Sequence, residues 1–115
     1  MALNIPVTRI NSINTPTVVE ETALSESAIT AEMSAANDNC FFIVDNSEGT
    51  ADATVVMKNG TPYAKSLGRV AAGKIAVLFL DSMLIKENRK YTLNVNPANS
   101  AIKISAVEFL PVVNN

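Results

Sequence analysis

The run CFFIV at residues 40–44 and the turn cluster DNSEG at residues 45–49 decide the fold class of this chain. A short continuous apolar run that ends in turn-forming residues is typical of a strand at the centre of a sheet, buried on both faces. Similar runs recur along the chain at intervals of roughly ten residues, separated by Asn, Gly and Pro turns. The sequence therefore predicts many short strands.

The strands expected after the central run differ in character. The stretch at 74–80 is the most apolar of the chain, whereas 90–96 alternates apolar and polar residues as a half-exposed strand does. The pair Asn59-Gly60 tolerates positive φ and predicts a tight turn. The expected strands on this side are 53–58, 63–69 (a short edge strand, and the least certain by pattern), 74–80, 90–96 and 101–110.

The last two strands carry two further expectations. Residues 96–100 have the composition of a five-residue hairpin loop between them. In the final strand, Ile104 and Val107 belong to apolar pairs that are out of phase with each other. We therefore predict a β-bulge near Ser105-Ala106, which would return both pairs to one face.

The first 26 residues look different from the rest, so we divide the chain into residues 1–26 and a β-sandwich domain at 27–115. Pro6 confines the β-prone start to an edge strand or an extended arm. If it is an arm, Ile5, Val7 and Ile10 are the residues expected to fill pockets on a partner, by adding a strand to a neighbouring sheet. If not, they belong to the first strands of the chain's own fold.

The stretch after this segment is open to two interpretations. Ala, Glu, Leu and Met favour a short helix over 24–36, whereas the alternation at 29–33 favours a strand. We prefer the strand. The fold class expected for the whole chain is all-β: an antiparallel β-sandwich, Ig-like or jelly-roll-like, with an extended N-terminal arm.

Composition excludes several function classes. The 115 residues carry a formal net charge of -2, and the nine basic residues are scattered, so a nucleic-acid site is not expected. One cysteine rules out an internal disulfide. The start lacks a charged region followed by an apolar run, and the longest apolar run is too short for a membrane span. We expect a soluble protein made in a reducing cytoplasm, without a signal peptide.

The search for chemistry finds no catalytic set. Histidine is absent, which removes the usual nucleophile partners and the commonest metal ligand. Cys40 begins an apolar strand and is expected to be a buried small hydrophobe. Calcium binding by Asp38, Asp45, Glu48 and Asp52 is conceivable, but the spacing does not match an EF-hand loop, and solvated turn residues are the simpler interpretation. We therefore predict no enzyme activity, no cofactor and no metal.

The proportion of charged residues in this chain is unusually low. Charged residues make up 17% of the chain and the mean hydropathy is +0.20, whereas small soluble domains average about 25% charged. Many alanines and a dense β-core would explain this. A surface covered by a partner would explain it equally well, because extended exposed apolar patches are uncommon on monomers.

Taken together, the order of features resembles auxiliary head or capsid-decoration proteins of tailed bacteriophages. The resembling parts are residues 4–9, residues 37–46, the VAAG turn at 70–73 and the closing stretch at 102–109. The resemblance implies a β-sandwich without catalytic residues that binds an assembled shell through the major capsid protein or another virion protein. It also implies a homo-oligomer located in the virion.

Two other functions fit the same pattern. A tail or neck component would assemble into rings instead of coating a shell. An adhesion module that binds a receptor or carbohydrate would need exposed rings at Tyr63 and Tyr91, since the four phenylalanines fall in core-like positions.

Overall fold

The computed structural model describes residues 3–10, 14–32, 40–58, 64–79 and 90–109, and every regular element among them is a β-strand. The strands are β1 (Leu3–Asn4), β2 (Val7–Ile10), β3 (Thr22–Ala23), β4 (Ala28–Glu32), β5 (Cys40–Asp45), β6 (Ala53–Lys58), β7 (Ala64–Val70), β8 (Ile75–Phe79), β9 (Lys90–Asn96) and β10 (Lys103–Phe109).

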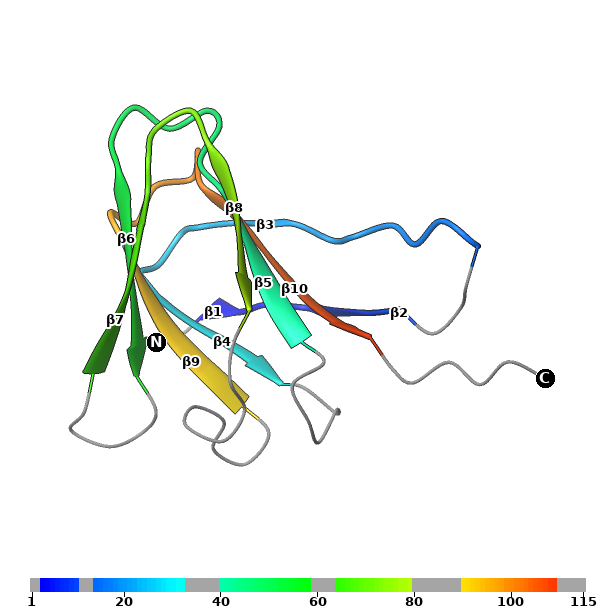
Figure 1. Ribbon diagram of the computed structural model, residues 1–115. Helices are drawn as coiled ribbons and strands as arrows, with labels where there is room; N and C mark the ends of the chain where they lie inside the picture. The colour runs from blue at the N-terminus through cyan, green and yellow to red at the C-terminus, as the bar shows by residue number, and fades with distance from the viewer. Residues whose placement is uncertain (1–2, 11–13, 33–39, 59–63, 80–89, 110–115) are drawn as a thin grey trace.

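These strands form two sheets that pack face to face (Figure 1). The first, sheet A, has the order β1-β4-β9-β6-β7. The second, sheet B, has the order β2-β10-β5-β8, and β3 also pairs with β10. Both sheets are mixed, because β1 lies parallel to β4 and β2 lies parallel to β10, while the other pairings are antiparallel. The all-β prediction is confirmed.

Side chains that alternate along β9 and β5 fill the space between the sheets. Tyr91, Leu93 and Val95 are buried on the inner face of sheet A, as their alternation predicts. The ring of Phe42 from sheet B meets Tyr91 edge-on, with centroids 6.0 Å apart and planes at 82°, a favourable aromatic arrangement. Other buried core residues are Ile29, Ala31, Val44, Val55, Ile104 and Ala106.

The structure settles two segments whose secondary structure was ambiguous from the sequence. Residues 28–32 form strand β4 and not a helix, because its alternation places Ile29 and Ala31 inward against β9. Residues 64–70 form an edge strand, β7, which pairs with β6 as the Asn59-Gly60 turn predicts. The turn itself lies outside the described residues.

The predicted bulge at Ser105-Ala106 is wrong. The register between β10 and β5 runs without a shift from Lys103↔Asp45 to Glu108↔Cys40. Val107 and Ser105 are buried on the outer face while Ile104 and Ala106 are buried on the inner one, so β10 is covered on both sides. Both apolar pairs are satisfied without realignment. The register shift in the described sheets lies between Val55 and Val56, opposite β7.

The predicted hairpin at 96–100 is also wrong. β9 belongs to sheet A and β10 to sheet B, so this loop crosses from one sheet to the other. A loop of this length can serve either connection, and the partners of each strand decide which one forms.

Candidate interaction surface

The outer face of sheet B is apolar and exposed near β8. Ile75, Val77 and Phe79 are 59%, 58% and 63% exposed, and all three lie on that one strand. In the register with β5, Val77 lies opposite Ile43 and Phe79 opposite Phe41, so half-buried apolar residues of β5 continue the same face. We call this surface the outer patch: Ile75, Val77, Phe79, Phe41, Ile43 and Phe109.

Three aromatic rings form one end of the outer patch. The Phe41 centroid lies 5.2 Å from that of Phe79 and 6.3 Å from that of Phe109, in tilted arrangements. The sequence places all four phenylalanines in the core, and this is wrong for Phe79. Of the four, Phe42 alone is fully buried. The aromatic group therefore lies at the surface of sheet B.

Beyond β10 the outer face is covered by the chain itself. Thr8 on β2 lies opposite Val107, and both are buried. The backbone N–H of Glu20 donates to Thr8 Oγ1 at 3.1 Å, so the segment that follows β2 returns over this part of the sheet. The exposed part of the outer face is therefore the part over β5 and β8.

A groove separates β8 from β7 at the side of the sandwich. It has a volume of about 130 Å3 and is lined mainly by apolar residues of both strands and of the core, among them Val44, Leu67, Ala76 and Leu78. An engineered apolar cavity of about 150 Å3 holds a benzene ring, so this groove has room for one apolar side chain.

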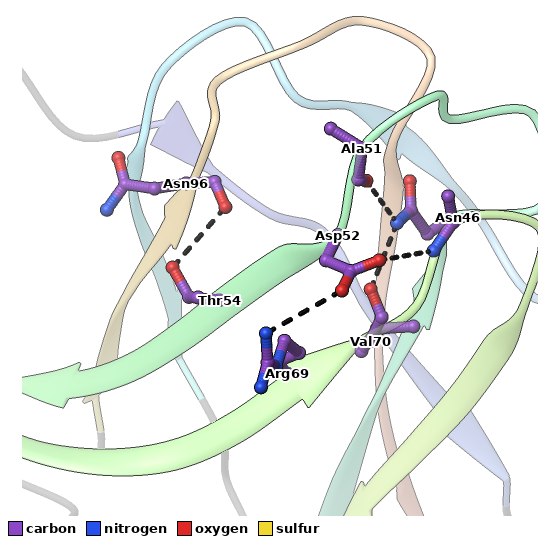
Figure 2. Close-up of polar contacts among 8 residues, drawn as sticks. Asn46, Ala51, Asp52, Thr54, Arg69, Val70 and Asn96 are labelled. Carbon is purple, nitrogen blue, oxygen red and sulfur yellow. Dashed lines mark hydrogen bonds and ion pairs between the residues drawn. The ribbon is translucent and has the colours of Figure 1, made fainter.

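The corner that joins β7 to β8 is fixed by the buried side chain of Asn46 (Figure 2). Its Nδ2 donates to the carbonyls of Ala51 and Val70 at 3.0 and 3.1 Å. Its backbone N–H donates to Lys74 O at 2.9 Å, which starts the pairing of β8 with β5. Gly49 is required beside it, because a Cβ there would lie 1.8 Å from Asn46 Oδ1. This corner holds the upper end of β8 in place.

The residues predicted to bind a partner lie at the other side of the sandwich. Ile5 is buried in the chain's own core, between β1 and β2, and its N–H donates to Thr30 O at 2.8 Å. Val7 is partly buried and packs against that core, while Ile10 is half-buried opposite Phe109. In this structure β1 and β2 are thus edge strands of the chain's own two sheets.

A polar group is buried near the same side. Glu108 on β10 is fully buried, and its Oε1 lies 2.6 Å from Arg9 Nε on β2, with the Arg9 side chain 47% exposed. Cys40, which lies opposite Glu108, is buried as predicted, and its Sγ is 3.1 Å from Tyr91 Oη. Since Cys40 and Glu108 are inaccessible to solvent, the group acts as a structural tie between β2 and the core.

The candidate calcium ligands do not converge. Asp45 accepts from Ser47, Glu48 lies 3.1 Å from Lys103 Nζ, and Asp52 lies 3.7 Å from Arg69. No cluster of three potential metal ligands occurs within the described ranges, and Asp38 lies outside them. The three described carboxylates thus face cations or turn groups of the chain.

The sequence feature related to the outer patch is the low proportion of charged residues, and no sequence motif marks the patch. The run at 74–80 is recognisable as a strand, but its position at the edge of sheet B is not. The low charge, for which a covered surface was one explanation, is the feature that anticipated it.

The chain matches no family model, and no curated protein or solved structure is similar to it at a significant level. In the part of the chain that the structure describes, no helix has the length and hydropathy that crossing a bilayer requires.

Proposed function

We propose that this chain is a non-enzymatic structural protein of a bacteriophage virion, which decorates or stabilises the capsid by attaching its outer patch to the shell. The observation that carries the proposal is the outer patch, an exposed apolar and aromatic surface on a domain with no described catalytic or metal-binding cluster.

The order of the strands supports a jelly-roll type of sandwich over an Ig-like one. From β3 to β8, consecutive strands alternate between the two sheets, except that β6 and β7 lie in the same sheet. The last two strands, β9 and β10, then insert between earlier strands. β10 enters between β3 and β5, and β9 between β4 and β6. This winding favours a double-sheet jelly roll, an architecture found among viral capsid proteins as well as lectins and cupins. The link from fold to function is an analogy.

The chemistry of the outer patch supports attachment to a protein surface. Aromatic residues are enriched at protein interfaces and charged residues are depleted at interface centres. The six patch residues carry no charge. On a shell, each copy meets many identical sites, so a modest contact suffices when neighbouring copies also touch.

The adhesion alternative receives no support from Tyr91, which is buried against Phe42. Tyr63 lies outside the described residues. In the described residues, the rings of the outer patch are those of phenylalanines, which have no polar tip with which to orient a sugar. A protein partner therefore fits this surface better than a carbohydrate.

Co-sedimentation with assembled bacteriophage shells tests the proposal. The full chain should pellet saturably with the shells, and Phe109→Ser, at the end of the patch away from β8, should reduce the bound fraction at least several-fold. Val18→Ser, at an 86% exposed valine outside the patch, is the matched control and should bind as the parent does. Binding to none of the shells offered, or equal binding by Phe109→Ser, would contradict the proposal.

A further inference from the structure

We infer that β8 is a self-association edge: two copies of this chain pair their β8 strands antiparallel about a two-fold axis at Val77, which joins their B sheets into one continuous sheet. The inference deepens the proposed function by naming how copies contact one another. It starts from a comparison of the strand edges that the two sheets present.

Natural proteins blunt sheet edges with charge, proline, bulges, short strands or a covering segment. β7 carries the exposed Arg69 and a register shift at Leu67-Gly68, where Gly68 has φ of 115°. β1 is two residues long. β2 follows Pro6 and is four residues long, and the segment bearing Glu20 contacts its Thr8 side chain. Each of these three edges is protected.

Among the described residues, none of these devices protects β8. Its sequence, Ile-Ala-Val-Leu-Phe from Ile75 to Phe79, contains no charge, proline or glycine, and its pairing with β5 is regular over all five residues. Within the described residues, no strand lies beyond it. An apolar edge with regular pairing and no such protection in the described residues is a template for another strand.

The hydrogen-bonding groups on the free side can be assigned from the pairing on the other side. Lys74 O accepts from Asn46 N, so Lys74 belongs to the residues whose backbone groups point toward β5. In an antiparallel pair this direction alternates, so Ala76 and Leu78 share it. The N–H and C=O groups of Ile75, Val77 and Phe79 therefore point away from β5, toward the free edge.

A second copy of β8 satisfies these groups in one particular register. When Val77 lies opposite Val77 of the other copy, Ile75 lies opposite Phe79. Each residue whose backbone groups point to the free edge then meets another such residue. Three such pairs exchange two hydrogen bonds each. Moving the axis to Ala76 or Leu78 leaves one of the three residues without a partner inside the strand. The strand is thus self-complementary about Val77, as an isologous interface requires.

The side chains fit the same arrangement. Ile75, Val77 and Phe79 of the two copies form one apolar stripe on the outer face. Ala76 and Leu78 of each copy face the groove at the side of the partner's sandwich, and both already line that groove in their own copy. Because the strand is uncharged, pairing brings no like charges together.

The contact area indicates a weak dimer. Pairing joins one five-residue strand from each copy and leaves the outer face of Ile75, Val77 and Phe79 exposed, so the contact is well below the area of about 800 Å2 per partner in a standard interface. We therefore expect a dimer that forms only as the protein concentration rises, and that becomes effective where copies are held close together on a shell.

Light scattering after size exclusion of the full chain over a range of concentrations tests the inference. The parent should shift from monomer to dimer as concentration rises. Val77→Lys and Val77→Glu, each placing like charges together at the axis, should be folded monomers by circular dichroism. Mixing these two variants should restore a dimer, because Lys and Glu then face each other. Val18→Lys, a charge at an exposed valine away from β8, should dimerise as the parent does.

A parent chain that stays monomeric at every concentration, a Val77→Lys variant that dimerises normally, or a mixture that stays monomeric would each overturn the inference. Failure here is distinguishable from failure of the proposed function, because these measurements contain no shell. A monomeric parent that still pellets with shells would keep the capsid role and remove β8 pairing. A dimeric parent that ignores shells would do the reverse.

Discussion

The two sides of the sandwich are built in opposite ways. At the N-terminal side the chain crosses from β1 in sheet A to β2 in sheet B, and Ile5 is buried at the crossing. At the other side, in the described residues, β7 and β8 meet at their corner, and a groove lies between them. The N-terminal side is sealed by the chain, whereas the described residues of the other side leave an apolar surface exposed, and both proposed interactions use that surface.

The N-terminal side also shows how an edge strand can be protected against pairing with another chain. Parallel pairing of β2 with β10 places Arg9 beside Glu108, and the buried carboxylate is neutralised by a cation from the edge strand. Any strand that replaced β2 without such a cation would remove this ion pair from the buried Glu108. The β8 edge contains no comparable selectivity device in its described residues, and shape and hydrogen bonding alone define its partner.

Deletion of residues 1–26 is the strongest test of this contrast. It removes Ile5 and Leu24 from the core together with β1, β2 and β3. Since loss of one buried Leu or Ile side chain costs about 2–5 kcal/mol, the truncated chain should lose at least roughly 5 kcal/mol and show little cooperative unfolding by circular dichroism. A truncated chain that melts at the same temperature as the full chain would instead identify these residues as a detachable arm.

A smaller effect is expected for Arg9→Ala, which removes the ion pair between β2 and the buried Glu108. Breaking a buried ion pair from one side costs about 3–5 kcal/mol, and the half-exposed Arg9 suggests the lower end, about 3 kcal/mol. Urea unfolding measures this difference. Arg9→Lys retains the charge and serves as the control, with a smaller loss. A loss below about 1 kcal/mol for Arg9→Ala would show that the sealed side does not depend on this pair.

The smallest effect on stability is expected from replacing Asp45, which lies opposite Ile75 of β8. The Ser47 hydroxyl and then the Ser47 backbone N–H donate to its carboxylate, which holds the pKa of Asp45 below its ordinary value, with desolvation opposing and Lys103 adding to the effect. A carboxyl group with a lowered pKa stabilises the fold above its unfolded pKa, and this contribution is lost as pH falls through the folded pKa.

Asp45→Asn should therefore be less stable than the parent at neutral pH by a few tenths of a kcal/mol, because the site is exposed. The difference should shrink as pH falls below about 4, when the parent also loses the carboxylate. Thermal melts of both chains between neutral and acidic pH measure this convergence, and Ser47→Ala should reproduce part of it. A stability difference that grows at low pH would contradict the assignment.

Several parts of the fold were accessible from residue patterns because they depend on local periodicity. The alternation of Tyr91, Leu93 and Val95 gives the inner face of β9 directly, since successive side chains of a strand point to opposite faces. Asn59-Gly60 marks a turn whose flanking strands do pair. The preference for a strand at 29–33 succeeds for the same reason.

The failures all concern which strands become neighbours. Residues 96–100 were expected to form a hairpin, and the out-of-phase pairs in the last strand to need a bulge. Both predictions assume that the last two strands pair with each other and that the last strand buries only one face. In the structure β10 lies between β5 and the N-terminal strands and is covered on both faces.

The candidate site shows the same division. The apolar stretch at 74–80 is visible in the sequence as a strand, and the low charge of the chain allows a covered surface. Nothing local distinguishes a central strand from an edge strand when both are apolar, as CFFIV at 40–44 and Ile75–Phe79 demonstrate. The sequence pattern therefore predicts a core position for Phe79, and for the N-terminal residues it leaves both a partner-binding arm and the first strands of the fold open.

The sequence by itself determined that this protein is all-β, where most of its strands run, which faces of β4 and β9 turn inward, and that Cys40 is buried. Only the tertiary structure decided that β8 is an edge with an exposed apolar face, while β2 is sealed against β10 by Arg9 and Glu108. The physical reason is that periodicity is a property of neighbouring residues, whereas the exposure of a strand depends on which distant strands hydrogen-bond to its two sides.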